Sequence, residues 1–274
     1  MAPYSVLMSV YAGEKAENFR LAAQSMLEQT VPPAEFVLAC DGPLPPELDK
    51  VVEKLVLDWP EIMKVLRLPE RRGLGEALRE GVLACRCEYV ARMDSDDLAL
   101  PERMALQLTR LEEDPDLAAL GGQIEEFSRE NLGRREVPLS TAEVRRRAAF
   151  RNPMNHMTVT FRRQAVLEAG NYMAFDRFED YHLWVRMLGR GQRLANLPQV
   201  LVRARVNEDT YARRGGLAYF RQSVAMQNHL RACGLCSRPE WLRNCLVRFG
   251  GKVLLPARVR SWFYQSFLRK ERAR

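Results

Sequence analysis

Three carboxylates stand within four residues of this chain. The segment Arg92-Met93-Asp94-Ser95-Asp96-Asp97 directly follows the apolar run Tyr89-Val90-Ala91. Clustered carboxylates repel one another unless a hard cation or a basic group offsets their charge. Mg²⁺ and Mn²⁺ prefer oxygen ligands and are often held by one or two carboxylates together with substrate phosphates. The cluster indicates either a divalent metal site that neutralises a diphosphate leaving group, or a solvated acidic turn before a helix near Pro101.

A second candidate lies at the start of a predicted helix near Phe178. Asp180 could cap that helix or complement its dipole. It could also be a general base, because an acceptor hydroxyl must lose its proton as it attacks an anomeric carbon. His156, in Asn152-Pro153-Met154-Asn155-His156, is one of only three histidines, and such a residue is more often structural than catalytic.

Two basic segments could meet phosphates. Arg203, Arg205, Arg213 and Arg214 lie close in sequence, where arginine forks would suit diphosphate oxygens, although a solvated basic loop is an equal alternative. Arg71-Arg72-Gly73-Leu74-Gly75 leads into a predicted helix whose free backbone N–H groups could meet an anion. The same five residues could also form only a tight turn.

The elements that position these residues alternate between strand and helix. Short β-rich apolar runs are followed by segments with apolar residues at helical spacing, which predicts βαβ units and a parallel sheet. The predicted strands are 4–10, 35–40, 63–68 and 88–93, and the helices between them are 16–29, 46–58 and 74–85. Beyond them we expect a helix at 102–113, strands at 117–122 and around 199–203, and a polar stretch at 125–138.

Ligands of such sheets lie outside the carboxyl ends of the strands. Three predicted strand ends carry chemically useful residues: Tyr11 to Glu14 after the first, Asp41 and Gly42 after the second, and Asp94 to Asp97 after the fourth. These residues are therefore expected to converge on one site.

Length and charge limit the remaining possibilities. A chain of 274 residues suits one main α/β domain with a tail. Its net charge of +7 is concentrated in residues 238–274, which hold ten Lys or Arg and two acidic residues, so a nucleic-acid-binding body is not indicated. The six cysteines, without a recognisable signal peptide or a run of about 18 apolar residues, predict reduced thiols and a cytoplasmic location. The Cys233/Cys236 pair lacks the second ligand pair of a zinc site.

Taken together, the motifs resemble family 2 glycosyltransferases of the GT-A fold, in particular the amylovoran-biosynthesis-like branch of bacterial polysaccharide enzymes. The resemblance covers residues 4–216 in the family's order. It rests on Ser9-Val10-Tyr11…Glu14, Ser25-Met26-Leu27…Gln29-Thr30, Cys40-Asp41-Gly42-Pro43, Gly73-Leu74-Gly75…Ala77-Leu78, Arg92 to Asp97, Asn152-Pro153…Asn155-His156, Glu179-Asp180-Tyr181…Leu183-Trp184 and Arg213-Arg214.

The resemblance implies a role for each of these positions. It implies a mostly parallel α/β sheet flanked by helices and a divalent metal cofactor, Mn²⁺ or Mg²⁺. Asp180 would be the base, and Asp94 and Asp96 would be the metal-binding Asp-x-Asp pair, with Asp94 also meeting ribose or sugar. Donor contacts would come from Tyr11, Glu14, Asp41, Arg72, Leu74, Ser95, Arg213 and Arg214. His156, Glu179 and Trp184 would contact the acceptor or be structural.

Two positions depart from the family's pattern. Many relatives carry two aspartates where this chain has Cys40-Asp41. Some place a histidine ligand after the last core strand, where this chain has Arg203-Ala204-Arg205-Val206-Asn207. The third protein ligand of the metal is therefore left open, and water could fill that position.

The resemblance also implies a reaction and a location. The expected reaction is inverting transfer of a sugar from a nucleotide diphosphate, preferably UDP, to a saccharide acceptor such as a lipid-linked oligosaccharide of a surface polysaccharide. The alternatives are a sugar nucleotidyltransferase of related fold and a non-catalytic sugar-nucleotide-binding protein. We expect a catalytic domain at 1–216 and a basic amphipathic extension at 217–274. Two stripes of the extension fall at helical spacing: Trp241, Leu242, Cys245, Leu246 and Phe249, and Leu255, Val259, Trp262, Phe263, Ser266 and Phe267. With these stripes the extension would either dock on the anionic inner face of the cell membrane or pack on the domain.

Overall fold

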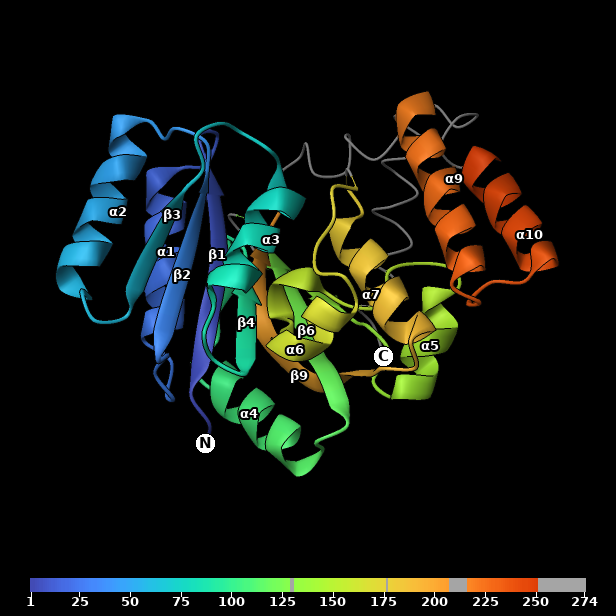
Figure 1. Cartoon of the computed structure of the whole chain (residues 1–274), viewed down its shortest axis with the longest axis horizontal. Coiled ribbons are helices and arrows are strands. Elements are labelled where there is room, and N and C mark those ends of the chain that lie inside the picture. Colours follow the sequence, from blue (N-terminus) through green and yellow to red (C-terminus); the bar gives the residue numbers. More distant parts are fainter. Residues whose placement is uncertain (129–130, 176, 207–215, 251–274) are drawn as a thin grey trace.

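A mixed β-sheet forms the centre of the molecule in the computed structural model, which describes residues 1–128, 131–175, 177–206 and 216–250. Within these residues the strands follow the order β3-β2-β1-β4-β8-β6-β9-β5, and β7 pairs with β6 (Figure 1). The strands are β1 (Tyr4–Tyr11), β2 (Glu35–Asp41), β3 (Met63–Arg67), β4 (Tyr89–Met93), β5 (Leu98–Ala99), β6 (Leu117–Phe127), β7 (Asn131–Arg135), β8 (Thr160–Arg162) and β9 (Arg193–Arg205).

The first four strands are parallel and confirm the predicted βαβ units. They are connected by α1 (Ala16–Leu27), α2 (Pro46–Asp58) and α3 (Leu74–Ala84). The register pairs Tyr11 with Asp41 across β1 and β2, and Met8 with Met93 across β1 and β4. The carboxyl ends of these three strands therefore lie side by side, as the sequence predicts.

The second half of the sheet contains antiparallel pairs that were not predicted. β8 runs antiparallel to both β4 and β6, and β5 runs antiparallel to β9. The polar stretch 125–138 contains the end of β6 and all of β7, which form a hairpin. The strand expected at 199–203 is longer, because β9 begins at Arg193 and continues through Pro198.

Further helices complete the described chain. They are α4 (Arg103–Glu113), α5 (Thr141–Ala148), η1 (His156–Thr158), α6 (Arg163–Glu168), α7 (Glu179–Gly189), α9 (Leu217–Ala232) and α10 (Arg238–Phe249). α5 was not predicted, although its start carries a capping box in which the Ser140 hydroxyl accepts from the Glu143 N–H and the Glu143 carboxylate accepts from the Ser140 N–H.

Two hydrophobic cores cover the two faces of the sheet. Alternation along β1 places Val6 and Met8 in one core and Leu7 in the other, and all three side chains are fully buried. The first core includes residues of α1, α2 and α4. The second includes residues of α3, α5, α6 and α7, together with Met226 and Leu230 of α9. α9 is thus packed onto the same core as the helix that carries Asp180.

The helices α9 and α10 lie at the end of the molecule opposite α2 (Figure 1). The buried residue of α10 is Asn244, whose amide donates to the Ala149 carbonyl and to Gln227 Oε1. The apolar stripe predicted on this helix is divided: Trp241 packs against the second core and Cys245 is half-buried. Leu242, Leu246 and Phe249 are 54%, 62% and 40% accessible. The second predicted stripe, within residues 251–274, lies outside the described residues. Among the described helices, none has the length and apolar character needed to cross a bilayer.

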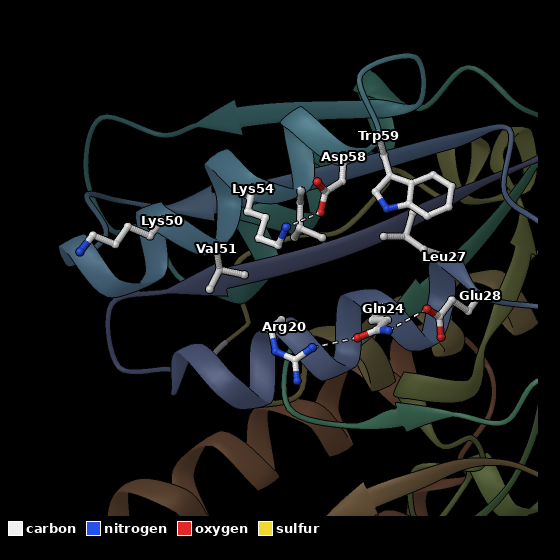
Figure 2. A pocket seen from close by; sticks show the side chains of 10 residues that line it. Arg20, Gln24, Leu27, Glu28, Lys50, Val51, Lys54, Asp58 and Trp59 are labelled. Carbon is white, nitrogen blue, oxygen red and sulfur yellow. Dashed lines mark hydrogen bonds and ion pairs between the residues drawn. The ribbon is translucent and has the colours of Figure 1, made fainter.

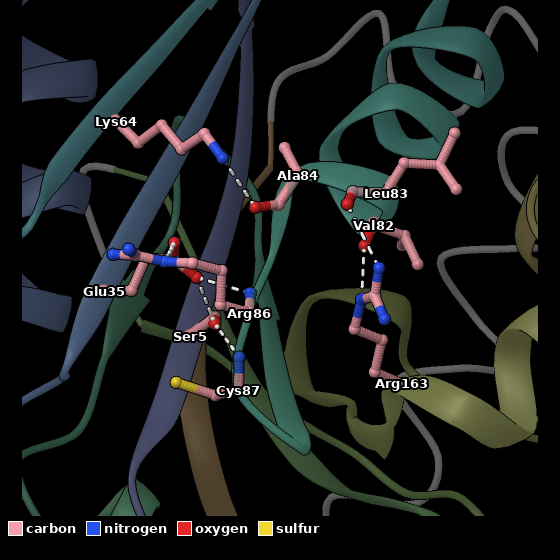
Figure 3. A network of polar contacts seen from close by, with 9 residues as sticks. All are labelled: Ser5, Glu35, Lys64, Val82, Leu83, Ala84, Arg86, Cys87 and Arg163. Carbon is pink, nitrogen blue, oxygen red and sulfur yellow. Dashed lines mark hydrogen bonds and ion pairs between the residues drawn. The ribbon is translucent and has the colours of Figure 1, made fainter.

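A polar network ties the amino end of β2 to the chain that enters β4 (Figure 3). The buried Glu35 carboxylate accepts from Ser5 Oγ at 2.6 Å and from the Arg86 N–H and Nε at 2.8 and 2.9 Å. Lys64 donates to the Ala84 carbonyl, and Arg163 donates to the Val82 and Leu83 carbonyls. The cations thus satisfy the last carbonyls of α3, where positive charge also complements the helix dipole.

Candidate active site

The carboxylate cluster follows β4 and is held by two arginines. Arg92, whose side chain is 1% exposed, donates from Nη2 to the Asp94 carboxylate. The Asp97 carboxylate accepts from the Arg205 N–H at 2.7 Å, and Arg205 Nε donates to the Asp96 carbonyl at 3.0 Å. β9 therefore closes one side of the cluster through Arg205. Ser95 and Asp97 of this turn are buried, whereas Asp94 and Asp96 are partly exposed, so the turn is held by protein contacts on one side and open to solvent on the other.

The electrostatics of the cluster fit a hard cation. Burial, together with the charges of Asp94 and Glu14, raises the pKa of Asp96 to about 7. Burial and the neighbouring Asp94 and Asp96 charges raise the pKa of Asp97 well above its usual range. Carboxyls with raised pKa values of this kind are short of positive charge, which an oxygen-preferring divalent ion would supply.

The carboxylates of the cluster suit a metal ion whose remaining ligands come from the substrate and from water. Among the described residues, no group of three or more His, Cys, Asp or Glu side chains is arranged to hold a metal. Asp94 and Asp96 supply carboxylate oxygens, and one or two carboxylates completed by phosphates and water are the usual arrangement for Mg²⁺ or Mn²⁺. The pair fits such an ion better than it fits a structural metal enclosed by protein ligands.

Residues after β1 meet the cluster directly. Ser95 Oγ donates to the Glu14 carboxylate at 3.2 Å, so the first and fourth strand ends are joined by a hydrogen bond. The Arg71 guanidinium carbon lies 4.9 Å from the centroid of the Tyr11 ring. This stacking brings the Arg71–Leu74 segment to the first strand end, and Arg71 was not among the residues predicted for the site.

Asp41 organises the segment that leads into α3. Its carboxylate accepts from the Arg72 N–H at 2.7 Å and from the Gly73 N–H at 3.0 Å. Gly42 has φ +88°, and a Cβ there would lie 2.8 Å from the Arg71 nitrogen. Only glycine allows both this conformation and the close approach of the two segments. Arg72 is exposed and Leu74 is half-buried beside this turn.

Asp180 is the first-turn carboxylate of α7, and two donors hold it. Asn152 Nδ2 donates to Oδ2 at 2.6 Å, and the Tyr181 N–H donates to Oδ1 at 2.7 Å. Burial raises the pKa of Asp180, and these hydrogen bonds and the Arg92 charge offset the rise only in part. A carboxyl that is fixed in orientation and ionises at a raised pKa has the properties of a general base.

His156 lies beside Asp180's helix in an aromatic environment. Its Nε2 is 2.9 Å from Tyr172 Oη, and its ring centroid is 6.1 Å from that of Trp184. Burial and the nearby Arg92 charge hold the pKa of His156 well below its usual range, so the ring is neutral. Trp184 is fully buried in the second core, and Glu179 is half-buried at the start of α7. The burial of Trp184 favours a structural role for it. His156 and Glu179 lie near Asp180, and contact with the acceptor stays a prediction for both.

The predicted diphosphate contacts Arg213 and Arg214 lie outside the described residues. The structure brings Arg205, which was considered as a phosphate contact, to the Asp96–Asp97 backbone and carboxylate. It also brings Arg92, Asn152 and Tyr172 to the site, and the sequence had given none of these three a role. Asn152 was visible in the Asn-Pro motif, but its bond to Asp180 joins residues 28 apart. No local pattern in the sequence signals such a contact.

A separate groove of about 480 Å³ lies between α1 and α2 (Figure 2). Its polar side chains bond along their own helices, as in the Lys54–Asp58 and Gln24–Glu28 pairs. None of its lining residues belongs to the site described above. They are Arg20, Gln24, Leu27, Glu28, Lys50, Val51, Lys54, Leu55, Asp58 and Trp59.

Comparison with known proteins identifies the family. The chain matches the family model described as glycosyl transferase family 2 over residues 5–170. The amylovoran biosynthesis glycosyltransferase AmsE of Erwinia amylovora is 36% identical over 265 residues, which cover 96% of this chain and 98% of AmsE. The chain therefore belongs to glycosyl transferase family 2, and the resemblance seen in its motifs is confirmed.

Two further comparisons concern chemistry and fold. The UDP-Gal:alpha-D-GlcNAc-diphosphoundecaprenol beta-1,3-galactosyltransferase of Escherichia coli is 30% identical over 273 residues and 97% of each chain. The mannosyltransferase PcManGT from Pyrobaculum calidifontis, solved with GDP-Man and Mn²⁺, superposes with a TM-score of 0.62 at 16% identity, covering 97% of this chain and 85% of PcManGT. The latter likeness confirms the GT-A fold.

Proposed function

We propose that the chain is a metal-dependent, inverting glycosyltransferase that moves a sugar from a UDP-sugar to a lipid-linked saccharide. The observation that carries this proposal is the position of Asp94. Its charge acts on Asp96, in the carboxylate cluster, and on Asp180, the candidate base. The proposed metal-binding pair and the proposed base therefore lie close enough to interact, which supports a single site for donor and acceptor.

The donor would lie across the three neighbouring strand ends. Tyr11, Glu14 and Asp41 would meet the base and ribose, because they follow β1 and β2 at the edge where α/β sheets bind nucleotides. The Arg72–Leu74 turn, which Asp41 holds in place, would cover them. UDP is preferred because the E. coli relative carries UDP-Gal in its name.

A divalent ion would be held by Asp96 and Asp94. When bound, such an ion neutralises the charge that develops on the leaving diphosphate. The solved complex of PcManGT with GDP-Man and Mn²⁺ supports Mn²⁺ as the first ion to test. Arg213 and Arg214 are proposed to contribute the remaining positive charge to the diphosphate.

The transfer step needs one base. Asp180 would accept the proton of the acceptor hydroxyl as the hydroxyl oxygen forms a bond to the anomeric carbon. The bond between that carbon and the diphosphate oxygen breaks at the same time, and UDP departs with the electron pair. Attack from the face opposite the leaving group inverts the configuration. Asn152 and the Tyr181 N–H fix the carboxylate for this step.

The acceptor and the location are proposed together. A lipid-linked saccharide is favoured by the diphosphoundecaprenol-linked sugar in the name of the E. coli relative. We propose that residues 1–216 form the catalytic domain and that residues 217–274 form an extension that docks on an anionic membrane surface near such an acceptor.

A donor screen tests the proposal. Purified full-length protein is incubated with a panel of nucleotide sugars, Mn²⁺ or Mg²⁺, and a synthetic GlcNAc-diphosphate-lipid, and the product anomer is determined by NMR. Transfer should require the metal and should fall at least about 100-fold in Asp96→Ala. Asp116→Ala removes an exposed carboxylate outside the site and is the matched control. An unchanged rate after EDTA treatment, or in Asp96→Ala, would reject metal dependence.

A further inference from the structure

Arg92 is a buried cation whose hydrogen bonds are incomplete. Its side chain is 1% exposed, and Nη2 donates to the Asp94 carboxylate. Nε and Nη1 are also buried, and neither has a hydrogen-bond partner among the described residues. Buried unpaired donors lower the stability of a protein, so a purely structural arginine is expected to use more of its nitrogens. We therefore expect Arg92 to act mainly through its positive charge.

The charge of Arg92 acts on the carboxylates of the Asp94–Asp97 cluster and on Asp180. It acts on Asp94, to which it is bonded, and on Asp180. The same charge also acts on Asp96 and Asp97. The guanidinium is thus a shared counter-charge for the carboxylate cluster and the base.

A second buried arginine provides a comparison. Arg103 is also fully buried, and it donates to the Arg92 carbonyl at 2.7 Å and to Gln107 Oε1 at 3.1 Å. Its other contacts are with the sulfurs of Met26 and Met93, and it has no carboxylate partner among the described residues. The two residues therefore share burial and side-chain type but differ in whether a carboxylate is bound.

We propose that Arg92 is a positioning residue that serves as the built-in counter-charge of the Asp94–Asp97 cluster while no metal is bound, and that it holds Asp94 in the orientation in which metal and donor meet it. The inference rests on the proposed function, because it assumes that the cluster binds a divalent ion. Arg92 does not touch the reacting atoms in this account and acts only through Asp94.

This role has a consequence for the metal-free protein. Without Arg92, the carboxylates of Asp94, Asp96 and Asp97 face one another with less positive charge nearby, so the metal-free state loses stability. A bound divalent ion restores the missing charge. Because a ligand stabilises the state that it binds, the metal should stabilise an Arg92 variant more than the wild type.

The first experiment measures thermal unfolding of full-length protein with EDTA and with saturating Mn²⁺, without nucleotide. Arg92→Met removes the charge at similar volume, Arg92→Lys retains it, and Arg103→Met is the matched control. The rise in Tm caused by Mn²⁺ should be larger in Arg92→Met than in the wild type by about 3 °C or more. It should match the wild type in Arg92→Lys. It should be smaller in Arg103→Met than in Arg92→Met, because the Arg103 charge acts on Asp94 and Asp97 without being bonded to either. Equal rises in Arg92→Met and Arg103→Met would show that Arg92 is merely structural.

A double-mutant cycle tests the pair if Arg92→Met is too unstable to compare. Asp94→Asn should lower the Tm of the wild type, because Arg92 loses its carboxylate partner, but raise that of Arg92→Met, because it then removes one of three carboxylates that repel one another. Strictly additive losses would overturn the proposal. A wild type that gains no stability from Mn²⁺ would reject the metal in the proposed function and the counter-charge role with it. The cycle would still report separately whether Arg92 positions Asp94.

Discussion

At the scale of single residues, Asp180 combines two hydrogen-bond donors with a raised pKa. Asn152 and the Tyr181 N–H each occupy one of its carboxylate oxygens, and burial raises its pKa. The remaining lone pairs can accept the proton of an acceptor hydroxyl without a change of side-chain orientation. In the function proposed above, this carboxylate acts in the chemical step and is not needed for donor binding.

Substituting Asp180 separates an effect on the chemical step from an effect on donor binding. Asp180→Asn keeps the shape of the side chain but removes its basicity, so kcat should fall by about 10²–10⁴-fold. The Kd for UDP with Mn²⁺, measured by calorimetry, should stay within about twofold of the wild type. Loss of UDP affinity with unchanged turnover per bound complex would assign Asp180 to binding instead.

The raised pKa of Asp180 also predicts a pH dependence. The base works only when ionised, and a raised pKa means that ionisation is completed at higher pH than for an ordinary aspartate with a value of 3.8. Activity should therefore rise with pH along an acid limb whose midpoint lies above 3.8, and should be lost as pH falls through it. The limb is measured from kcat at saturating donor, acceptor and Mn²⁺. Residual activity of Asp180→Asn that follows the same limb would assign the titration to another group.

The sequence was informative about these residues where the signal is local. The Asp94–Asp97 cluster and Asp180 could be identified because each stands in a short pattern at the end or start of an element. The partners could not be identified in the same way. Asn152 reaches Asp180 across 28 residues, and Arg205 reaches Asp97 across 108. Such contacts depend on how α7 and β9 are placed, which no local spacing encodes.

At the scale of elements, α3 connects the Arg72–Leu74 turn to α7, the helix that carries Asp180. The last carbonyls of α3 are bonded to Lys64 and Arg163, and its first residues follow the turn that Asp41 holds. A Cβ on Gly75 would lie 2.9 Å from the Met173 carbonyl oxygen and 3.5 Å from Glu179 Cβ. The amino end of α3 therefore packs directly against the segment that enters α7.

Enlarging Gly75 should disturb this contact with little loss of stability. Alanine favours the helix by about 1 kcal/mol over glycine, which offsets part of the overpacking. The backbone oxygen of Met173 cannot yield as a side chain would, so α3 and α7 should separate slightly. Gly75→Ala should therefore lower kcat/KM by about tenfold or more, with a Tm close to the wild type. Arg79→Ala, on the exposed face of α3, is the control, and equal activity of the two variants would contradict the prediction.

The elements themselves could be predicted to different degrees. The strands from β1 to β4 were found because they are apolar runs separated by amphipathic helices. β5 and β8 have two and three residues, too few for a periodic signal. β7 is polar, and β9 contains Pro198, so tertiary pairing with β6 decided their conformation against local preference.

At the scale of the whole molecule, α9 and α10 connect the catalytic core to a basic apolar surface. α9 contributes Met226 and Leu230 to the second core, and α10 is anchored by Asn244. This packing leaves Leu242 and Leu246 exposed on the outer side of α10, beside Arg243. The helix thus packs on the domain through Asn244 and also presents apolar residues beside a positive charge, and docking on a membrane stays a prediction.

We predict that this surface of α10 binds anionic membranes. Apolar side chains can enter the interface, and each basic residue near an anionic leaflet adds about 1 kcal/mol. In co-sedimentation with vesicles containing phosphatidylglycerol, the full-length double variant Leu242→Ser/Leu246→Ser should bind at least about tenfold more weakly than the wild type, because two exposed leucines no longer enter the bilayer. Leu139→Ser, which removes an exposed leucine elsewhere, should bind like the wild type.

Binding of the wild type should weaken at high salt and on zwitterionic vesicles. Equal binding by the double variant and the wild type would remove α10 from the docking surface, and any remaining membrane affinity would then belong to residues 251–274.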